Sequence, residues 1–135
     1  MIKSANKLKK EAWSEFSKYI RLRSADKEGN VICVTCGKKL HWKESQASHF
    51  IDSRCNSVLF NEKIVHPACY RCNVILHGNK VKYFLYMKSI GYTDKQLEIF
   101  EMLKNKPLKY TKQDYIDISD KYKAKVEMLK KKKKV

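Results

Sequence analysis

Two pairs of cysteines with the same internal spacing, Cys33–Cys36 and Cys69–Cys72, constrain the fold of this chain more than any other feature. Each pair encloses two residues, and a turn of that length presents both sulfur atoms to a single ion. The first residues lack the apolar stretch of a secretory signal, which indicates a reducing compartment and disfavours disulfides. We therefore predict one structural Zn²⁺ held by the four thiolates.

Four thiolates close the coordination sphere of zinc, so the predicted site holds structure and activates no water. Cys55 is left over, and we expect it to have no role in binding metal. A redox-active CxxC motif would be expected once and beside a βαβ pattern, which this sequence does not have. Any catalytic chemistry must therefore come from other side chains that the zinc site holds in place.

The chain is strongly basic. It carries 30 Lys and Arg residues against 14 Asp and Glu residues, a formal net charge of +16 in 135 residues. An excess of this size indicates a polyanionic partner, because cations that neutralise phosphates release condensed counterions. The sequence contains no run of about 18 apolar residues, so a membrane partner is not expected. We expect a cytoplasmic protein that binds nucleic acid.

Apolar periodicity and capping residues predict helices towards both ends of the chain. Apolar residues recur at every fourth position over about residues 4–23, which is typical of an amphipathic helix with Trp13 in the core. Thr93 begins a capping-box pattern, and Thr111 is a candidate cap for a last helix. The Lys130–Lys134 run is expected to be frayed and solvated.

The middle of the chain alternates short strands with cysteine turns. Residues 31–42 are typical of strand, turn and strand, and another short strand is expected over residues 47–51. Pro67 suits the start of a helix carrying residues 68–77. These elements predict an α+β fold, a small zinc-stapled ββα core with flanking N- and C-terminal helices. As one compact unit, the chain divides into residues 1–26 (basic amphipathic helix), 27–80 (four-cysteine zinc site and ββα core) and 81–135 (helical region with a Lys-rich tail).

Candidate catalytic residues lie between and just after the cysteine pairs. Three histidines, His49, His66 and His77, occur there, and Asn73 directly follows the last cysteine. A strand-borne histidine facing a helix that carries an oxygen or nitrogen ligand is the arrangement of ββα-metal nucleases. In such sites a neutral imidazole takes a proton from water, while a divalent ion stabilises the leaving 3′ oxygen.

The motifs also occur in a specific order over roughly residues 8–100. They run through WSEFSKYIRLR (13–23), CVTCG (33–37), ASHF (47–50), LFNE (59–62), VHPACYRCN (65–73), LHGN (76–79) and IG (90–91). This order resembles the HNH (His-Me finger) endonucleases, particularly the zinc-stapled phage enzymes that resolve branched DNA. Within that group the sequence is most similar to the lambda NinG (Rap) phage recombination proteins.

The resemblance implies roles for particular residues. Carried over position by position, His49 would be the general base and Asn73 a ligand of a catalytic Mg²⁺ or Mn²⁺. The implied activity is a structure-selective endonuclease that cuts branched recombination intermediates, of the Holliday-junction or D-loop type, in the cytoplasm of a phage host. HNH enzymes commonly have Asp directly before the base, where this chain has Ser48. Glu62 and Asp52 are the nearest carboxylates that would replace it as metal ligands.

Other assignments have alternatives. His66 and His77 are the next candidates for the base; alternatively, His66 fixes its loop or touches phosphate, and His77 caps the C-terminus of its helix. Symmetric cutting of two strands would suit a homodimer on branched or double-stranded DNA. Ile64 occupies the place of the middle Asn of the HNH pattern. This departure and Ser48 favour the competing class, a nonenzymatic zinc-stabilised nucleic-acid-binding module. The candidate DNA contacts are Arg21, Arg23, Arg54 and Arg71, with solvated surface as the alternative.

Overall fold

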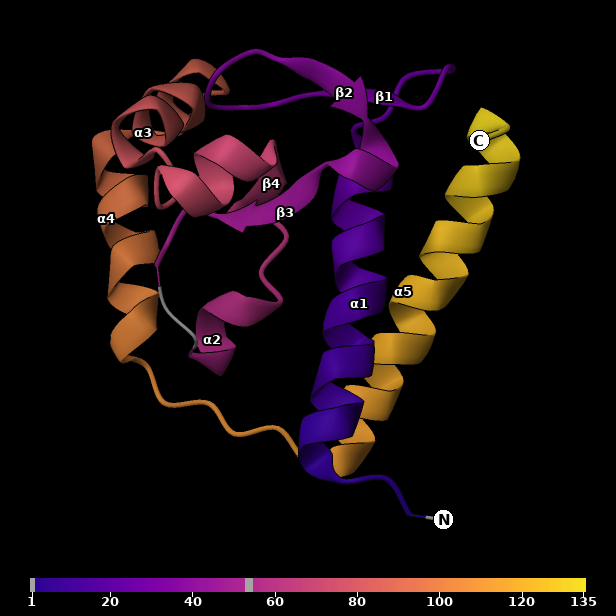
Figure 1. Cartoon of the computed structure of the whole chain (residues 1–135). Coiled ribbons are helices and arrows are strands. Elements are labelled where there is room, and N and C mark those ends of the chain that lie inside the picture. The colour runs from indigo at the N-terminus through magenta and orange to yellow at the C-terminus, as the bar shows by residue number, and fades with distance from the viewer. Residues whose placement is uncertain (1, 53–54) are drawn as a thin grey trace.

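The computed structural model describes residues 2–52 and 55–135 of the chain. Two long helices, α1 (Ala5–Arg23) and α5 (Lys112–Lys133), lie side by side along one edge of the molecule (Figure 1). Within the described ranges no helix is both long enough and apolar enough to cross a membrane.

α1 forms where the apolar periodicity predicts it. Ser4 Oγ accepts a hydrogen bond from the Lys7 backbone N–H at 3.2 Å and so caps the helix. α5 begins with a capping box in which Thr111 and Asp114 exchange side-chain and backbone hydrogen bonds. The apolar stripe of α1 packs on α5, which confirms the expected amphipathic helix. Its buried members include Leu8, Ala12, Phe16 and Ile20.

The two helices run parallel, so their C-terminal ends lie together (Figure 1). Lys133 Nζ donates to the carbonyl oxygens of Leu22, Arg23 and Ala25 at 3.0, 2.8 and 2.7 Å. The last carbonyls of a helix have no partner within it and carry partial negative charge, so they attract an ammonium group. α5 therefore continues through Lys133, and the prediction that Lys130–Lys134 is frayed was wrong, whereas Lys131, Lys132 and Lys134 are exposed to solvent as predicted.

Two antiparallel hairpins form the sheets. β1 (Asn30–Ile32) pairs with β2 (Lys39–His41), and β3 (Gln46–His49) pairs with β4 (Val65–Ala68). The first hairpin carries Cys33 and Cys36 in its loop, as the strand–turn–strand prediction required.

Pro67 lies in β4, opposite Ala47, and does not begin a helix, which corrects that prediction. A proline fits a strand where the ladder requires no N–H, and the Pro67 carbonyl still accepts from Val34 N–H at 3.1 Å. The helical segment after β4 is a short π-helical turn at Arg71–Ile75.

Three further helices surround the second hairpin. α3 (Lys80–Ser89) is followed by α4 (Asp94–Met102), which starts with the predicted capping box of Thr93 and Gln96. The short α2 (Asn56–Leu59) lies between β3 and β4 in the chain.

The β3–β4 hairpin is sandwiched between helices. α1 covers the face on which Ala47 and His49 lie, and Trp13 of α1 stacks on the His49 ring. α3 covers the opposite face, where the Tyr83 hydroxyl donates to the Ser48 carbonyl at 2.8 Å. The main core fills the spaces on both sides. The predicted α+β class, with a four-cysteine cluster and flanking helices, is confirmed.

Candidate functional site

The four cysteines of the CxxC pairs meet at one point between the β1–β2 loop and the residues after β4. Their sulfur atoms all lie within 4.8 Å of one another, and the Sγ atoms of Cys36 and Cys69 are 3.8 Å apart. Tetrahedral zinc with Zn–S bonds of about 2.3 Å needs sulfurs about 3.8 Å apart. The geometry therefore fits the predicted zinc ion, and Cys55 lies outside the cluster, as expected.

Hydrogen bonds favour the thiolate at Cys33, whereas burial raises the pKa of Cys36 to about 12 and also raises the pKa of Cys69. Burial raises the pKa of Cys33, but the side chain of Thr35 and backbone N–H groups outweigh burial and bring that pKa to about 6. Thr35 Oγ1 is 3.3 Å from Cys33 Sγ, and Asn79 Nδ2 donates to Cys72 Sγ at 3.6 Å. A thiolate, not a thiol, binds metal, so a lowered pKa favours binding.

His49 lies at the end of β3 with one ring nitrogen fixed by the backbone. Its Nε2 is 3.1 Å from the carbonyl oxygen of Leu59, the last residue of α2. A carbonyl can only accept, so the proton of the neutral ring must be on Nε2 and the lone pair on Nδ1. Nδ1 has no hydrogen bond to any described residue. It is also absent from the fully buried unpaired atoms, so it remains accessible.

The surroundings of His49 keep the ring neutral. Burial is the largest cause that lowers the pKa of His49 below its usual value, and the nearby positive charge of Lys80 lowers it further. The Leu59 carbonyl and the charge of Asp52 act in the opposite direction. Neutral imidazole with its lone pair on Nδ1 is the form that accepts a proton at neutral pH.

Sequence reasoning missed two partners of His49. Trp13 was expected only in the core, but its ring stacks on His49 with centroids 5.0 Å apart. Lys80 Nζ donates to the carbonyls of His49 and Phe50 at 2.7 and 3.0 Å. The sequence signal that could have indicated Lys80 is Gly78 of the LHGN motif (76–79), two residues before it. A Cβ there would lie 2.8 Å from Lys80 Cε.

Asn73 lies elsewhere on the hairpin. Its Nδ2 donates to Gln46 Oε1 at 2.7 Å, at the opposite end of β3 from His49. Because side chains alternate along a strand, Gln46 and His49 project from opposite faces. The structure therefore does not bring Asn73 to His49. The helix that faces this histidine is α1, not the expected helical segment that carries Asn73.

Glu62 is engaged by other residues. Its carboxylate accepts from the Tyr122 hydroxyl at 2.7 Å and lies 3.6 Å from the cationic groups of Arg23 and Lys125. Over the described part of the chain, the four cysteines are the only group of three or more His, Cys, Asp or Glu that could hold an ion. Asp52 is the carboxylate whose charge acts on His49.

The other candidate histidines have different environments. His66 is buried in β4, with Nδ1 3.1 Å from the Tyr83 hydroxyl, and burial lowers its pKa to about 4. His77 is exposed, has a left-handed backbone (φ 50°) and follows the π-helical turn.

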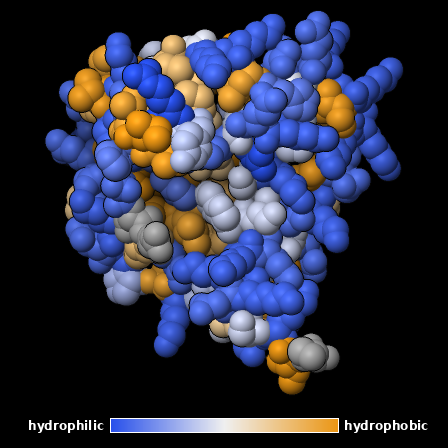
Figure 2. All heavy atoms as spheres, in the orientation of Figure 1, coloured by the Kyte–Doolittle hydropathy of each residue, from blue (hydrophilic) through white to orange (hydrophobic). Residues whose placement is uncertain are grey.

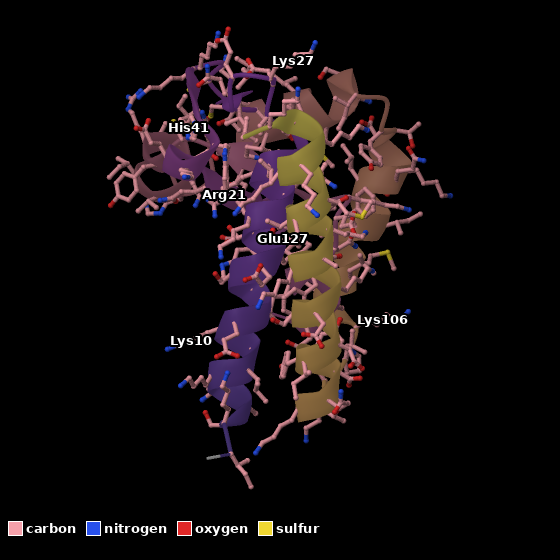
Figure 3. The ribbon with its side chains drawn as sticks, turned by 90° about the vertical axis from the view of Figure 1, so that its right-hand side faces the viewer. Lys10, Arg21, Lys27, His41, Lys106 and Glu127 are labelled. Carbon is pink, nitrogen blue, oxygen red and sulfur yellow. The ribbon has the colours of Figure 1, made fainter. Side chains whose placement is uncertain are left out.

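Two of the candidate DNA-binding arginines bind the protein itself, and a third is exposed. Arg21 donates to the carbonyls of Trp42 and Ser45, at 3.3 and 3.4 Å, and Figure 3 shows it extending from α1. Arg23 Nη2 donates to the carbonyls of Glu62 and Val65, so both guanidinium groups bind the protein itself. Arg71 is exposed. Arg54 lies outside the described residues.

A hollow of about 410 Å³ borders the His49 partners. It is lined by Lys9, Lys10 and Asn6 of α1 together with Trp13 and Leu59. Figure 3 shows Lys10 extending away from the α1–α5 pair. Two lysines therefore line a hollow whose wall includes Trp13 and Leu59, the two residues that contact the His49 ring.

Comparison with known proteins gives one positive result. The family described as Bacteriophage Lambda NinG protein matches residues 1–133. Among curated proteins and among solved structures, nothing matches the chain.

Proposed function

The chain belongs to the bacteriophage lambda NinG family, and from that premise we propose that it is a structure-selective DNA endonuclease. The substrate class is branched recombination intermediates, such as a Holliday junction or a D-loop, in the cytoplasm of a phage host. The observation that carries the proposal is the hydrogen bond from His49 Nε2–H to the Leu59 carbonyl. This bond leaves Nδ1 as the acceptor of a half-buried neutral imidazole.

In the proposed reaction, water is added across the P–O3′ bond of the DNA backbone. His49 Nδ1 takes a proton from the water, whose oxygen forms the new bond to phosphorus as the P–O3′ bond breaks. Trp13 and the Leu59 carbonyl hold the ring in place, and Lys80 fixes the backbone of the strand end.

A divalent ion remains part of this proposal through the family resemblance. Mg²⁺ commonly uses one or two carboxylates together with substrate phosphates, and Asp52 offers one carboxylate near His49. The bound ion would stabilise charge on the leaving 3′ oxygen. Asn73 and Glu62 contact other groups, so they do not support this part of the proposal.

Charge supports the choice of DNA as the partner. The chain has a net charge of +16, and hydrophilic side chains cover most of the face seen in Figure 2, around a hollow with apolar atoms. Lys9 and Lys10 line a hollow with Trp13, the residue that stacks on His49, and supply cations there. Phosphate contacts of this kind position a duplex without reading its sequence.

The test is cleavage of a synthetic four-way junction, and of its separate linear arms, by zinc-loaded protein. We expect nicking of the junction with Mg²⁺ or Mn²⁺, less cleavage of the arms, and none after chelation. Zinc measured after chelation distinguishes loss of the catalytic ion from loss of the structural one. The His49→Ala protein, purified in parallel, controls for contaminating nucleases.

The second candidate function is a nonenzymatic zinc module that binds nucleic acid. It is favoured by one observation: within residues 2–52 and 55–135, Asp52 belongs to no group of three or more His, Cys, Asp or Glu side chains that could hold an ion. Junction binding without cleavage under either ion would establish this function and contradict the first.

A further inference from the structure

A second recess, separate from His49, lies between α5, α2 and β4. It is an open groove of about 720 Å³. Its walls come from segments that are far apart in the sequence, and His49 is not among them. The volume falls in the range of small-ligand sites, roughly 300–1,000 Å³.

The groove is positively charged. Lys63 and Lys121 line it, and neither forms an ion pair with a carboxylate of the described residues. Glu62 also lines the groove, but Arg23, Lys125 and the Tyr122 hydroxyl already engage its carboxylate. Two uncompensated ammonium groups are therefore available for an anionic ligand.

Aromatic rings border the same groove. Phe60, Tyr92 and Tyr110 are each partly exposed there. Phe60 and Tyr110 meet edge to face with centroids 5.9 Å apart, and Tyr92 meets Phe100 in the same way at 5.2 Å. An edge-to-face contact covers one face of one ring in each pair, so other ring faces are left on which a flat ligand can stack.

One hydrogen-bond acceptor in the groove lacks a donor. The Tyr83 hydroxyl donates to the Ser48 carbonyl, so its oxygen accepts from His66 Nδ1–H, and the lone pair of the neutral ring is on Nε2. His66 lines the groove, so a ligand that donates an N–H group fits this wall.

We propose that the groove binds an unpaired nucleotide of single-stranded DNA. Its phosphate lies on Lys63 and Lys121, and its base lies against the aromatic rings with an amino or imino group towards His66. Inside a duplex, pairing occupies the imino N–H and one N–H of each amino group, and neighbouring bases cover the base face, so the whole base is available only where strands are unpaired. The inference rests on the proposed function to the extent that branched DNA supplies such nucleotides.

The test uses zinc-loaded full chain and a single-stranded hexanucleotide that contains 2-aminopurine. We expect quenching of the probe on binding, and an affinity about five- to a hundredfold lower in the Lys63→Gln/Lys121→Gln variant. Both lysines are exposed, so folding should survive, and circular dichroism with zinc content checks this. Lys131→Gln, an exposed lysine of α5 outside the groove, is the matched control.

A hexanucleotide with abasic sites keeps the phosphates and removes the bases. We expect it to bind about five- to a hundredfold more weakly than the 2-aminopurine probe. Equal affinity of the two probes, or equal losses in the groove variant and in Lys131→Gln, would overturn the proposal. Probe binding that depends on the groove in a protein that never cuts a junction would reject the nuclease and keep the nucleotide site. Normal junction cleavage with a groove that binds no probe would do the reverse.

Discussion

The two faces of the β3–β4 hairpin carry one histidine each, and the two histidines differ in burial and in hydrogen-bond partner. On the α1 face, His49 is half-buried and donates from Nε2 to the Leu59 carbonyl. On the α3 face, His66 is buried and donates from Nδ1 to the Tyr83 hydroxyl. The acceptor that each ring meets selects its tautomer, so the remaining lone pair is on Nδ1 of His49 and on Nε2 of His66.

The difference shows how local structure assigns chemistry to a side chain. Leu59 is the last residue of α2, and the carbonyls at a helix C-terminus lack partners within the helix. That carbonyl orients His49 and leaves its Nδ1 for a proton. The Tyr83 hydroxyl, fixed by the Ser48 carbonyl, instead makes His66 part of a buried chain of hydrogen bonds.

Removing the zinc site should unfold the β3–β4 hairpin and so abolish the difference between the environments of His49 and His66. Cys69 directly follows β4, and Cys69→Ser leaves three ligands, so we expect loss of zinc and of the folded hairpin. Zinc content and circular dichroism measure this. Cys55→Ser, outside the cluster, is the control and should keep both. Full folding without stoichiometric zinc would contradict the assignment.

Substituting each histidine in turn should separate the two faces. A general base contributes typically about 10²–10⁴-fold, so His49→Ala should reduce the rate of junction cleavage by that factor while DNA affinity stays nearly the same. His66→Asn should leave the cleavage step largely intact. Single-turnover rates at saturating junction and Mg²⁺ make the comparison. Equal rates in wild type and His49→Ala would move the base elsewhere.

We expect acid to lower the free energy of unfolding through His66, on the buried α3 face of the hairpin. Burial lowers the pKa of His66 from about 6.5 to about 4 in the folded state, so the unfolded chain binds the proton more readily. The free energy of unfolding should fall by on the order of 3 kcal/mol as the pH falls from 6.5 to 4. Because zinc release adds to this loss, the quantity to measure by urea denaturation is the difference between wild type and His66→Asn. Parallel pH profiles of the two proteins would show that His66 does not titrate as expected.

Lys80 gives the smallest and most specific change. Burial and the charge of Lys80 both lower the pKa of His49, so cleavage should reach half its maximum below the usual imidazole pKa of about 6.5. Lys80→Met removes the charge and should move that midpoint upwards. Lys80→Arg keeps the charge and should leave the midpoint unchanged. A midpoint that is the same in all three proteins would exclude the charge effect.

The sequence predicted those parts of the molecule that short-range signals determine. Thr93 and Thr111 cap their helices as predicted, because a cap involves residues only three positions apart. The CxxC pairs predicted the cysteine cluster, because each turn is local and two pairs suffice for one ion.

The remainder depends on pairings between distant residues. Nothing near Glu62 in the sequence indicates that Tyr122 and Lys125 hold its carboxylate. Trp13 fits an apolar stripe equally well whether it packs in the core or stacks on His49. The environment of a candidate site therefore required the tertiary structure, even where its residue types were evident.

The parallel pairing of α1 with α5 has a consequence for biosynthesis. The chain leaves the ribosome N-terminus first, so α1 emerges long before α5, whose Lys133 holds its last carbonyls. Until then the apolar stripe of α1 is uncovered on the side that α5 will occupy. The α1–α5 pair therefore forms late, through contacts between residues far apart in the sequence. Until it forms, either rapid completion of the chain or a chaperone must protect the apolar stripe of α1 from aggregation.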